Sequence, residues 1–187
     1  MASLVLSGDT SGSITVSAPA VAGSTTQTLV NVTGTLAPIV SGTAVTASST
    51  SVDFTGIPSW VKRITVMFNG VSLSGTAFLL VQLGDAGGIE NSGYLSSTCN
   101  QSGTVTQSGS GFVAGGQGAT LICSGIMTIS ALGSNSWVSS HSAKLSTTAT
   151  CYGGGDKTLS DTLTQLRITT SNGTDTFDAG SINLLWE

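Results

Sequence analysis

Few side chains in this chain could carry out acid–base or nucleophilic chemistry. His141 is the single histidine, so a Ser-His-Asp or Cys-His arrangement would have to use it. Its neighbours Ser139, Ser140 and Ser142 do not have the pattern of an activated nucleophile. We therefore interpret His141 as a surface histidine in a serine-rich loop, and metal sites built from several imidazoles are excluded.

Two pairs of carboxylates are the other candidates for catalysis, Asp156 with Asp161 and Asp175 with Asp178. Paired carboxylates are what glycoside hydrolysis needs. Each pair lies beside Gly or Asn, where an Asp side chain commonly closes a turn through its own backbone. We therefore predict turns at these positions and no catalytic residues.

The segment 171–178 contains several side chains with oxygen atoms, the ligands that calcium prefers. It lacks the full acidic spacing of the known calcium-binding loop, so a hairpin turn is the favoured interpretation. The glycine run 153–155 superficially resembles a phosphate loop, but Asp156 stands where the signature needs Gly. No metal site and no cofactor is predicted, while a cation near Asp175 stays an open alternative.

The three cysteines, Cys99, Cys123 and Cys151, are widely spaced and form no C-x-x-C pair. Zinc and redox motifs depend on such closely spaced pairs. A reducing cytoplasm disfavours disulfides, so we predict free, buried thiols. A disulfide between two of them, formed after release from the cell, stays an open alternative.

Charge is scarce along the chain, with five basic and nine acidic residues among 187, or 7%, against roughly 25% in typical globular proteins. The net charge of −4 offers no basic surface to phosphate backbones, which argues against nucleic-acid binding.

Apolar runs such as 78–81 fall far short of the roughly 20 residues that cross a bilayer, so no membrane insertion is expected. The first residues lack the basic start and apolar length of a secretory signal, so we expect the chain to be made and kept in the cytoplasm.

The elements that must position these side chains are predicted to be short strands. Frequent Ser, Thr and Val favour half-buried pleated surfaces, and Gly, Asn and Ser supply turns. Alternation of Ile64, Val66 and Phe68 with other residues predicts one buried face for a strand over 61–68. Further strands are predicted at 77–83, 120–130, 136–140, 165–170 and 181–187, with a hairpin turn at 133–135. The pattern predicts an all-β fold, an antiparallel β-sandwich of jelly-roll type.

Composition divides the chain into three parts. Residues 1–40 contain neither Lys nor Arg, and their short extended pieces bury too little to be stable alone, so we expect an N-terminal attachment arm. Those pieces are predicted at 13–18, 25–30 and 35–40. Residues 41–51 are a Ser/Thr/Ala run expected to form a linker or entry strand, and residues 52–187 the β-sandwich domain. Leucines at helical spacing within 156–166 are expected to form at most one turn in a loop.

Aromatic residues are few, so the position of each in the sequence is informative. Trp60 precedes a predicted strand, where packing in the core or against a subunit is favoured over ligand stacking. Trp137, Tyr94 and Tyr152 lie near loops rich in Ser and Gly and could present their rings to a sugar or protein receptor. The alternative is that they cover the rim of the core. The candidate receptor contacts are Trp137, His141 and Tyr152.

Two segments resemble a module of virion proteins of tailed bacteriophages. The first is DFTGIPSWVKRITV at 53–66 with NGVS at 69–72, and the second runs from RITT at 167–170 to DTFDAGSIN at 175–183. The opening GDTSG at 8–12, with PAVAG at 19–23, resembles the attachment ends of phage tail-fibre and head-decoration proteins. The resemblance covers the chain from Thr43 to its end well and the first forty residues loosely.

The resemblance implies a non-enzymatic protein of the virion surface, either a tail fibre or a capsid decoration subunit. Such a subunit attaches through its N-terminal segment, presents the sandwich outward and leaves the host by lysis. Its implied partners are other capsid or tail proteins and copies of itself, arranged as a homotrimer. Two alternatives stay open: an adhesin domain that binds a host receptor or surface glycan, and a virion-borne polysaccharide hydrolase, against which the modest length and single histidine weigh.

Overall fold

The structure, a computed structural model, describes residues 3–7, 11–17, 38–115 and 118–187. Contacts divide the chain into two compact units, Met1–Leu36 and Ala37–Glu187. Every regular element in the described ranges is a β-strand, and every strand pairing is antiparallel. The prediction of an all-β, antiparallel fold is confirmed. Within the described ranges, no helix is long and apolar enough to span a membrane.

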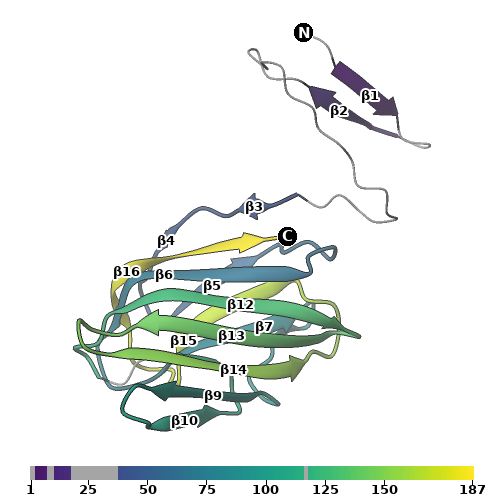
Figure 1. The fold of residues 1–187 in the computed structure, drawn as a ribbon. Coiled ribbons are helices and arrows are strands. Elements are labelled where there is room, and N and C mark those ends of the chain that lie inside the picture. Colours follow the sequence, from purple (N-terminus) through teal and green to yellow (C-terminus); the bar gives the residue numbers. More distant parts are fainter. Residues whose placement is uncertain (1–2, 8–10, 18–37, 116–117) are drawn as a thin grey trace. The chain divides into compact units, whose positions relative to one another are not determined.

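The second unit consists of two sheets (Figure 1). The larger sheet has nine strands in the order β10-β9-β14-β13-β12-β6-β16-β3, with β4 also paired to β16. Their bounds are β3 (Val40–Ser41), β4 (Val45–Thr46), β6 (Arg63–Leu73), β9 (Leu95–Asn100), β10 (Val105–Ser108), β12 (Cys123–Gly133), β13 (Ser136–Lys144), β14 (Thr150–Thr158) and β16 (Phe177–Trp186).

The smaller sheet has five strands in the order β11-β7-β15-β5, with β8 also paired to β7. The strands are β5 (Ser51–Thr55), β7 (Leu79–Asp85), β8 (Gly88–Ile89), β11 (Phe112–Gly115) and β15 (Gln165–Thr170). Every residue of β7 is buried, because β7 lies between two neighbours in the sheet and is covered on both faces. The apolar run at 77–83 was predicted to be such a strand. The jelly-roll connectivity stays a prediction.

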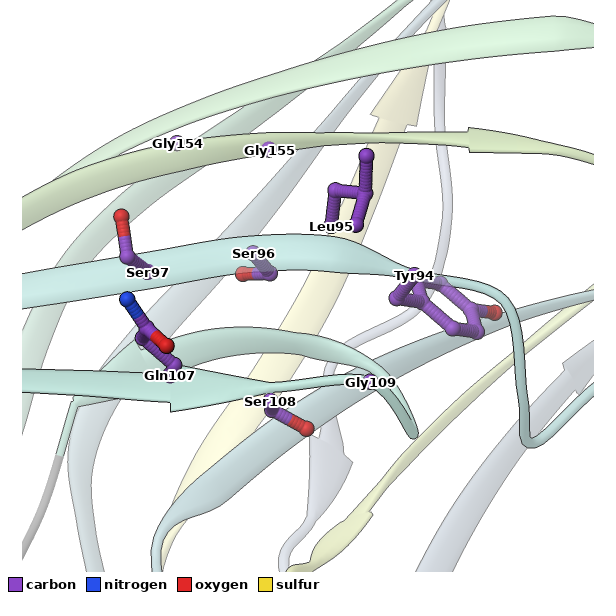
Figure 2. Close-up of a pocket in the computed structure, with 9 residues that line it drawn as sticks. All are labelled: Tyr94, Leu95, Ser96, Ser97, Gln107, Ser108, Gly109, Gly154 and Gly155. Carbon is purple, nitrogen blue, oxygen red and sulfur yellow. The ribbon is translucent and has the colours of Figure 1, made fainter.

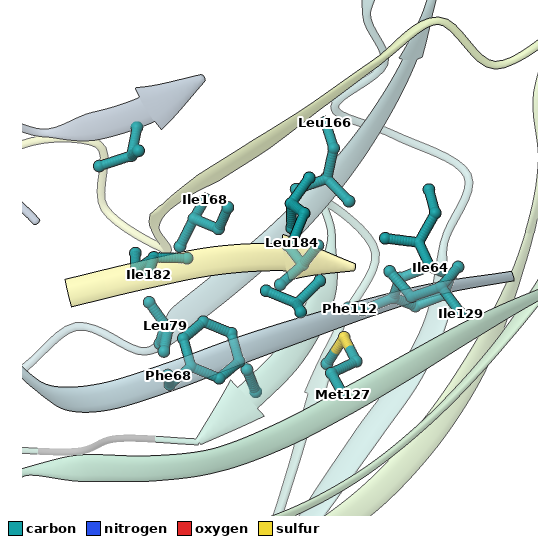
Figure 3. Close-up of a cluster of buried hydrophobic side chains, with 14 of the residues drawn as sticks. Ile64, Phe68, Leu79, Phe112, Met127, Ile129, Leu166, Ile168, Ile182 and Leu184 are labelled. Atoms are coloured by element: carbon teal, nitrogen blue, oxygen red, sulfur yellow. The ribbon is translucent and has the colours of Figure 1, made fainter. Parts of the chain in front are cut away.

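The core lies between the two sheets. Period-two alternation places Ile64, Val66 and Phe68 of β6 inward, together with Ile182 and Leu184 of β16. Figure 3 shows Ile64, Phe68, Ile182 and Leu184 among apolar residues from the other strands: Leu79, Phe112, Met127, Ile129, Leu166 and Ile168. Burying each such side chain stabilises the fold by roughly 1.5–3 kcal/mol before conformational entropy is counted. Two sheets with a shared apolar interior form a sandwich-like arrangement.

The hairpin predicted around residues 133–135 joins β12 to β13. Gly133, Ser134 and Asn135 all have positive φ, at 124°, 50° and 60°, which is the backbone conformation of a tight hairpin turn. The register then runs from Ala131 opposite Trp137 to Ser124 opposite Lys144. Residues 165–170 form β15 with the predicted bounds, and Leu166 and Ile168 point inward as expected.

The segment 41–51 supplies strand residues to both sheets, since it holds the end of β3 and all of β4 in the larger sheet and the first residue of β5 in the smaller one. Its strands β3 and β4 both pair with β16, and Ala47 is buried with 3% of its surface exposed. The compact second unit therefore starts at Ala37, ahead of the predicted domain start at residue 52. Residues 156–166 contain no helical turn, and Leu159 and Leu163 are buried from the irregular segment that connects β14 to β15.

In the residues of the first unit that the structure describes, β1 (Ser3–Ser7) pairs with β2 (Ser13–Ser17) in a hairpin. Leu4 lies opposite Val16 and Val5 lies opposite Thr15. The side chains of Leu4, Val5, Leu6 and Val16 are each more than half exposed. The strand predicted at 13–18 is present as β2. The piece predicted at 25–30, and all but the end of the piece at 35–40, lie outside the described residues.

Candidate functional site

The three candidate receptor contacts, Trp137, His141 and Tyr152, do not share one surface. Trp137 and His141 point into the sandwich from β13, with 6% and 7% of their surfaces exposed, whereas Tyr152 on β14 is 58% exposed. The interpretation of His141 as a surface histidine in a loop is wrong. The serine neighbours form a strand whose alternation turns Trp137 and His141 inward and the serines at 140 and 142 outward. A receptor can reach Tyr152 and cannot reach the other two rings.

The imidazole of His141 is held by one hydrogen bond. Its Nε2 lies 2.9 Å from the Thr98 hydroxyl, and that hydroxyl donates to the carbonyl of Tyr152 at 3.3 Å. The Nδ1 atom is buried without a hydrogen-bond partner. Burial lowers the pKa of His141 to about 4, so the ring is neutral at pH 7. The neutral ring therefore packs inside the sandwich, with the Thr98 hydroxyl as its hydrogen-bond partner.

The carboxylate pairs are held in local structure. Asp175 accepts a hydrogen bond from the backbone N–H of Ala77 at 2.9 Å, and Asn172 Oδ1 accepts from the N–H groups of Thr174 and Asp175. Hydrogen bonding of the carboxylate to the Asn172 side chain, and then to the Ala77 N–H, lowers the pKa of Asp175. Asp178 accepts a hydrogen bond from the Ser72 hydroxyl. The prediction of a turn holds for the segment around Asn172 that leads to Asp175, but it is wrong for Asp156 and Asp178, which lie within the strands β14 and β16.

Nothing in the described part of the chain gathers three His, Cys, Asp or Glu residues into a metal-binding group. The expectation of free thiols agrees with the structure, in which Cys99, Cys123 and Cys151 are unpaired. Cys123 and Cys151 are buried, and Cys99 is half-buried beside Tyr152. Burial, with a smaller contribution from Cys151, raises the pKa of the Cys123 thiol to about 12, so this thiol is unreactive at pH 7.

An ionic cluster that the sequence did not indicate lies at one end of the sandwich. The Lys157 ammonium forms an ion pair with Glu90 and lies 5.4 Å from the centroid of the Tyr94 ring. Glu90 also accepts from the Ser160 N–H at 2.7 Å, and Asp85 accepts from the Ser160 hydroxyl at 2.6 Å. Lys157 is only 5% exposed. Its ion pair connects β14 to Glu90, the residue that follows β8. Its partners lie far apart in sequence, and no local pattern could have revealed them.

A groove of about 610 Å³ lies where β10, β9 and β14 run side by side (Figure 2). Its lining comes from Tyr94, Leu95, Ser96, Ser97, Gln107, Ser108, Gly109, Gly154 and Gly155. Serine hydroxyls and the Gln107 amide supply hydrogen-bonding groups, and Leu95, 72% exposed, supplies an aliphatic surface. No Asp, Glu, Lys, Arg or His lines the groove. Such a surface can bind a neutral polar ligand and has no acid–base pair for hydrolysis.

Comparisons of this chain with protein-family models, curated proteins and solved structures gave no match. The function therefore has to be argued from the residues and their geometry.

Proposed function

We propose that this protein is a non-enzymatic subunit of a bacteriophage particle surface, a tail fibre or a capsid decoration protein, attached through its N-terminal unit. The observation that carries the proposal is the β1–β2 hairpin. Leu4, Leu6 and Val16 lie on one face of it, each more than half exposed, and Val5 is exposed on the other face. A two-stranded hairpin is marginally stable in water, so these aliphatic side chains need a covering surface.

Attachment by this hairpin fits the chemistry of its strands. The residues of β1 and β2 carry no charged side chain, so the hairpin can be buried against another subunit without desolvating an ion. An uncovered strand edge can also add to a neighbouring sheet through backbone hydrogen bonds. Identical copies placed around a symmetry axis would bury the same aliphatic face, which fits the homotrimer implied by the virion resemblance.

The remaining support comes from the resemblance of segments 53–72 and 167–183 to the phage virion module, and from the sandwich itself. In the described ranges His141 is buried, Asp175 and Asp178 accept hydrogen bonds from neighbouring groups, and Asp156 lies exposed on β14. A chain with so few charges and a Ser/Thr-rich surface suits a static coat. We place the protein on the outside of the particle, where it leaves the host by lysis.

The test is incorporation into particles assembled from a phage genome that carries this gene. Leu6→Asp would place a charge on the aliphatic face of the hairpin, so we expect incorporation to fall at least tenfold by immunoblot of purified particles. Ser7→Asp, at the end of the same strand, is the matched control and should be incorporated normally. Normal incorporation of the Leu6→Asp protein would contradict attachment through the hairpin.

A receptor- or glycan-binding adhesin is the second candidate, and the groove between β9, β10 and β14 is the observation that favours it. We expect Ser97→Trp, which fills the groove, to reduce adsorption of particles to host cells while incorporation stays normal. Adsorption that is unchanged in this variant would remove the adhesin alternative. Measured release of reducing sugar from host polysaccharide would instead support the hydrolase.

A further inference from the structure

The outward face of the five-stranded sheet has a polar pocket. On β7, Leu80 and Gln82 alternate with the core residues of the same strand, so both side chains point away from the core. They are nevertheless only 2% and 7% exposed. Both line a pocket of about 330 Å³, which we call the Gln82 pocket.

Segments that lie far apart in the sequence form the Gln82 pocket. The strand β15 contributes Arg167, which lies opposite Gln82 in the register of β15 with β7. The other lining residues are Leu80, Ile89, Asn91, Ser110, Thr169 and residues 170–173. The pocket therefore combines paired strands with three of the segments that connect strands.

The amide of Gln82 is anchored through its nitrogen. Its Nε2 donates to the carbonyl oxygen of Ser110 at 2.8 Å, and no donor among the described residues bonds its Oε1. Because this side chain is buried and already fixed, little conformational entropy is lost when Oε1 accepts a hydrogen bond from a ligand. Gln82 is therefore a preorganised acceptor.

The amide of Asn172 is anchored through its oxygen. Its Oδ1 accepts hydrogen bonds from the Thr170 hydroxyl at 3.2 Å and from the N–H groups of Thr174 and Asp175 at 3.1 and 3.0 Å. These bonds leave the two protons of Nδ2 to donate to a ligand. The pocket lining thus contains a fixed acceptor and a fixed donor.

The charged side chain that lines the Gln82 pocket is already paired. Arg167 donates from Nε and Nη2 to the two carboxylate oxygens of Asp53, at 2.6 and 2.7 Å. A phosphate or carboxylate ligand would have to compete with this bidentate pair. The lining residues include no Asp, Glu, Lys or His. An uncharged ligand therefore suits the pocket better than an ion.

We propose that the Gln82 pocket binds one neutral sugar residue. A sugar hydroxyl both donates and accepts, so adjacent hydroxyls match Gln82 Oε1 and Asn172 Nδ2. The half-buried Ile89 offers an aliphatic surface to the C–H groups of the ring. Small-molecule sites have volumes of roughly 300–1,000 Å³, so a pocket of about 330 Å³ suits a ligand as small as a monosaccharide.

The lining favours a sugar over a peptide. Peptides are held by apolar anchors or by addition of a strand to an open sheet edge. Leu80 and Ile89 are the apolar side chains of the lining, and Leu80 is almost completely buried. The strand β7 has partners on both sides, so it offers no open edge.

Sugar binding is separate from attachment to particles, which we assign to the N-terminal unit. The Leu6→Asp protein should bind the sugar as the wild type does, and a variant of the Gln82 pocket should be incorporated normally. Failure of either proposal therefore leaves the other intact.

Binding is tested on the full chain by saturation-transfer NMR with the methyl glycosides of glucose, galactose, mannose and N-acetylglucosamine. We expect at least one of them to bind with a Kd of about 1–10 mM, as for a ligand of roughly a dozen non-hydrogen atoms. Gln82→Met keeps the length of the side chain and removes the amide, so binding should weaken at least tenfold. Gln107→Met makes the same change in the groove between β9, β10 and β14, and should leave binding unchanged.

A second pair of variants tests the site without changing a buried residue. Asn91 is exposed, and Asn91→Trp would fill the pocket, so binding should become undetectable up to about 50 mM sugar. Ser97→Trp, in the other groove, is the control and should bind normally. Circular dichroism establishes that each variant is folded, and the Asn91→Trp result decides if Gln82→Met does not fold. Absence of binding for all four sugars, binding that survives Asn91→Trp, or binding that is lost in the Gln107 and Ser97 variants would overturn the proposal.

Discussion

At the scale of single residues, the Lys157–Glu90 ion pair is the contact on which a side-chain substitution should act most strongly. The Lys157 side chain is 6% exposed and that of Glu90 is 23% exposed. Glu90→Gln leaves the ammonium buried without an opposite charge, so we expect the free energy of unfolding to fall by about 2 kcal/mol. Urea unfolding followed by tryptophan fluorescence measures this loss.

The Arg63–Glu187 pair provides the matched control for that substitution. Its side chains are 55% and 26% exposed, so water solvates the arginine when the partner is lost. We expect Glu187→Gln to lower the free energy of unfolding by less than about 1 kcal/mol. Equal losses in the two variants would show that Lys157 is solvated when its partner is removed.

The buried imidazole of His141 predicts a pH dependence of stability. The pKa of His141 is about 4 in the folded protein, and a histidine in an unfolded chain titrates near 6.5. Between these values the unfolded state binds a proton that the folded state does not, so stability falls as the pH is lowered from about 6.5 to 4. The full difference corresponds to about 3 kcal/mol.

His141→Gln removes this titration and keeps a polar side chain opposite Thr98. We expect its free energy of unfolding to change less than that of the wild type between pH 7 and pH 4.5, as measured by urea unfolding at each pH. Carboxylates with a lowered pKa, such as Asp53 beside Arg167, also contribute less to the stability of the fold below about pH 5. This loss is the same in both proteins and cancels when their pH profiles are compared. Parallel pH profiles for the two proteins would contradict a buried neutral imidazole.

At the scale of elements, the glycine run in β14 is required by close approach of the neighbouring strand. A Cβ on Gly153 would overlap the carbonyl oxygen of Ser97 on β9 and lie 2.7 Å from His141 Cε1. We expect Gly153→Ala to lower the free energy of unfolding by about 2 kcal/mol or more, because backbone atoms have to move.

Gly109→Ala is the control for that glycine. A Cβ there would meet no atom closer than the Tyr94 carbonyl oxygen at 3.7 Å, an ordinary contact. Its effect on the free energy of unfolding, measured with urea, should stay within about 0.5 kcal/mol of zero. Tolerance of alanine at Gly153 would mean that β9 and β14 lie farther apart than in the structure.

The elements were predictable from the sequence where alternation and turn residues agree. Residues 165–170 have a clear period of two, and Gly133 with Asn135 supply the positive φ of a hairpin, so both were located correctly. The strand around His141 was misread, because serines on its outward side look like a loop when the opposite side is not known to be covered. The groove was not predictable, since it depends on β9, β10 and β14 lying side by side, which strand pairing over long sequence separations decides.

At the scale of the whole molecule, the two compact units differ in how far their apolar side chains are buried. The hydrogen bonds and apolar core of the sandwich are supplied within Ala37–Glu187, whereas the hairpin of the first unit leaves its aliphatic side chains exposed. Stability should therefore reside in the second unit and attachment in the first. This division predicts that two truncations, which differ by ten residues, change the free energy of unfolding by different amounts.

Deleting residues 1–36 should leave the free energy of unfolding within about 0.5 kcal/mol of the wild type, since no strand of the sandwich is removed. Deleting residues 1–46 also removes β3 and β4, together with the hydrogen bond from the Gly42 N–H to the Leu184 carbonyl at 2.8 Å. We expect that longer deletion to lower the free energy of unfolding by about 2 kcal/mol, because β16 loses its edge partners. Both proteins are measured by urea unfolding at concentrations where the wild-type mass is constant. A large loss from the shorter deletion would mean that the N-terminal unit helps to hold the sandwich together, and its role could then no longer be limited to attachment.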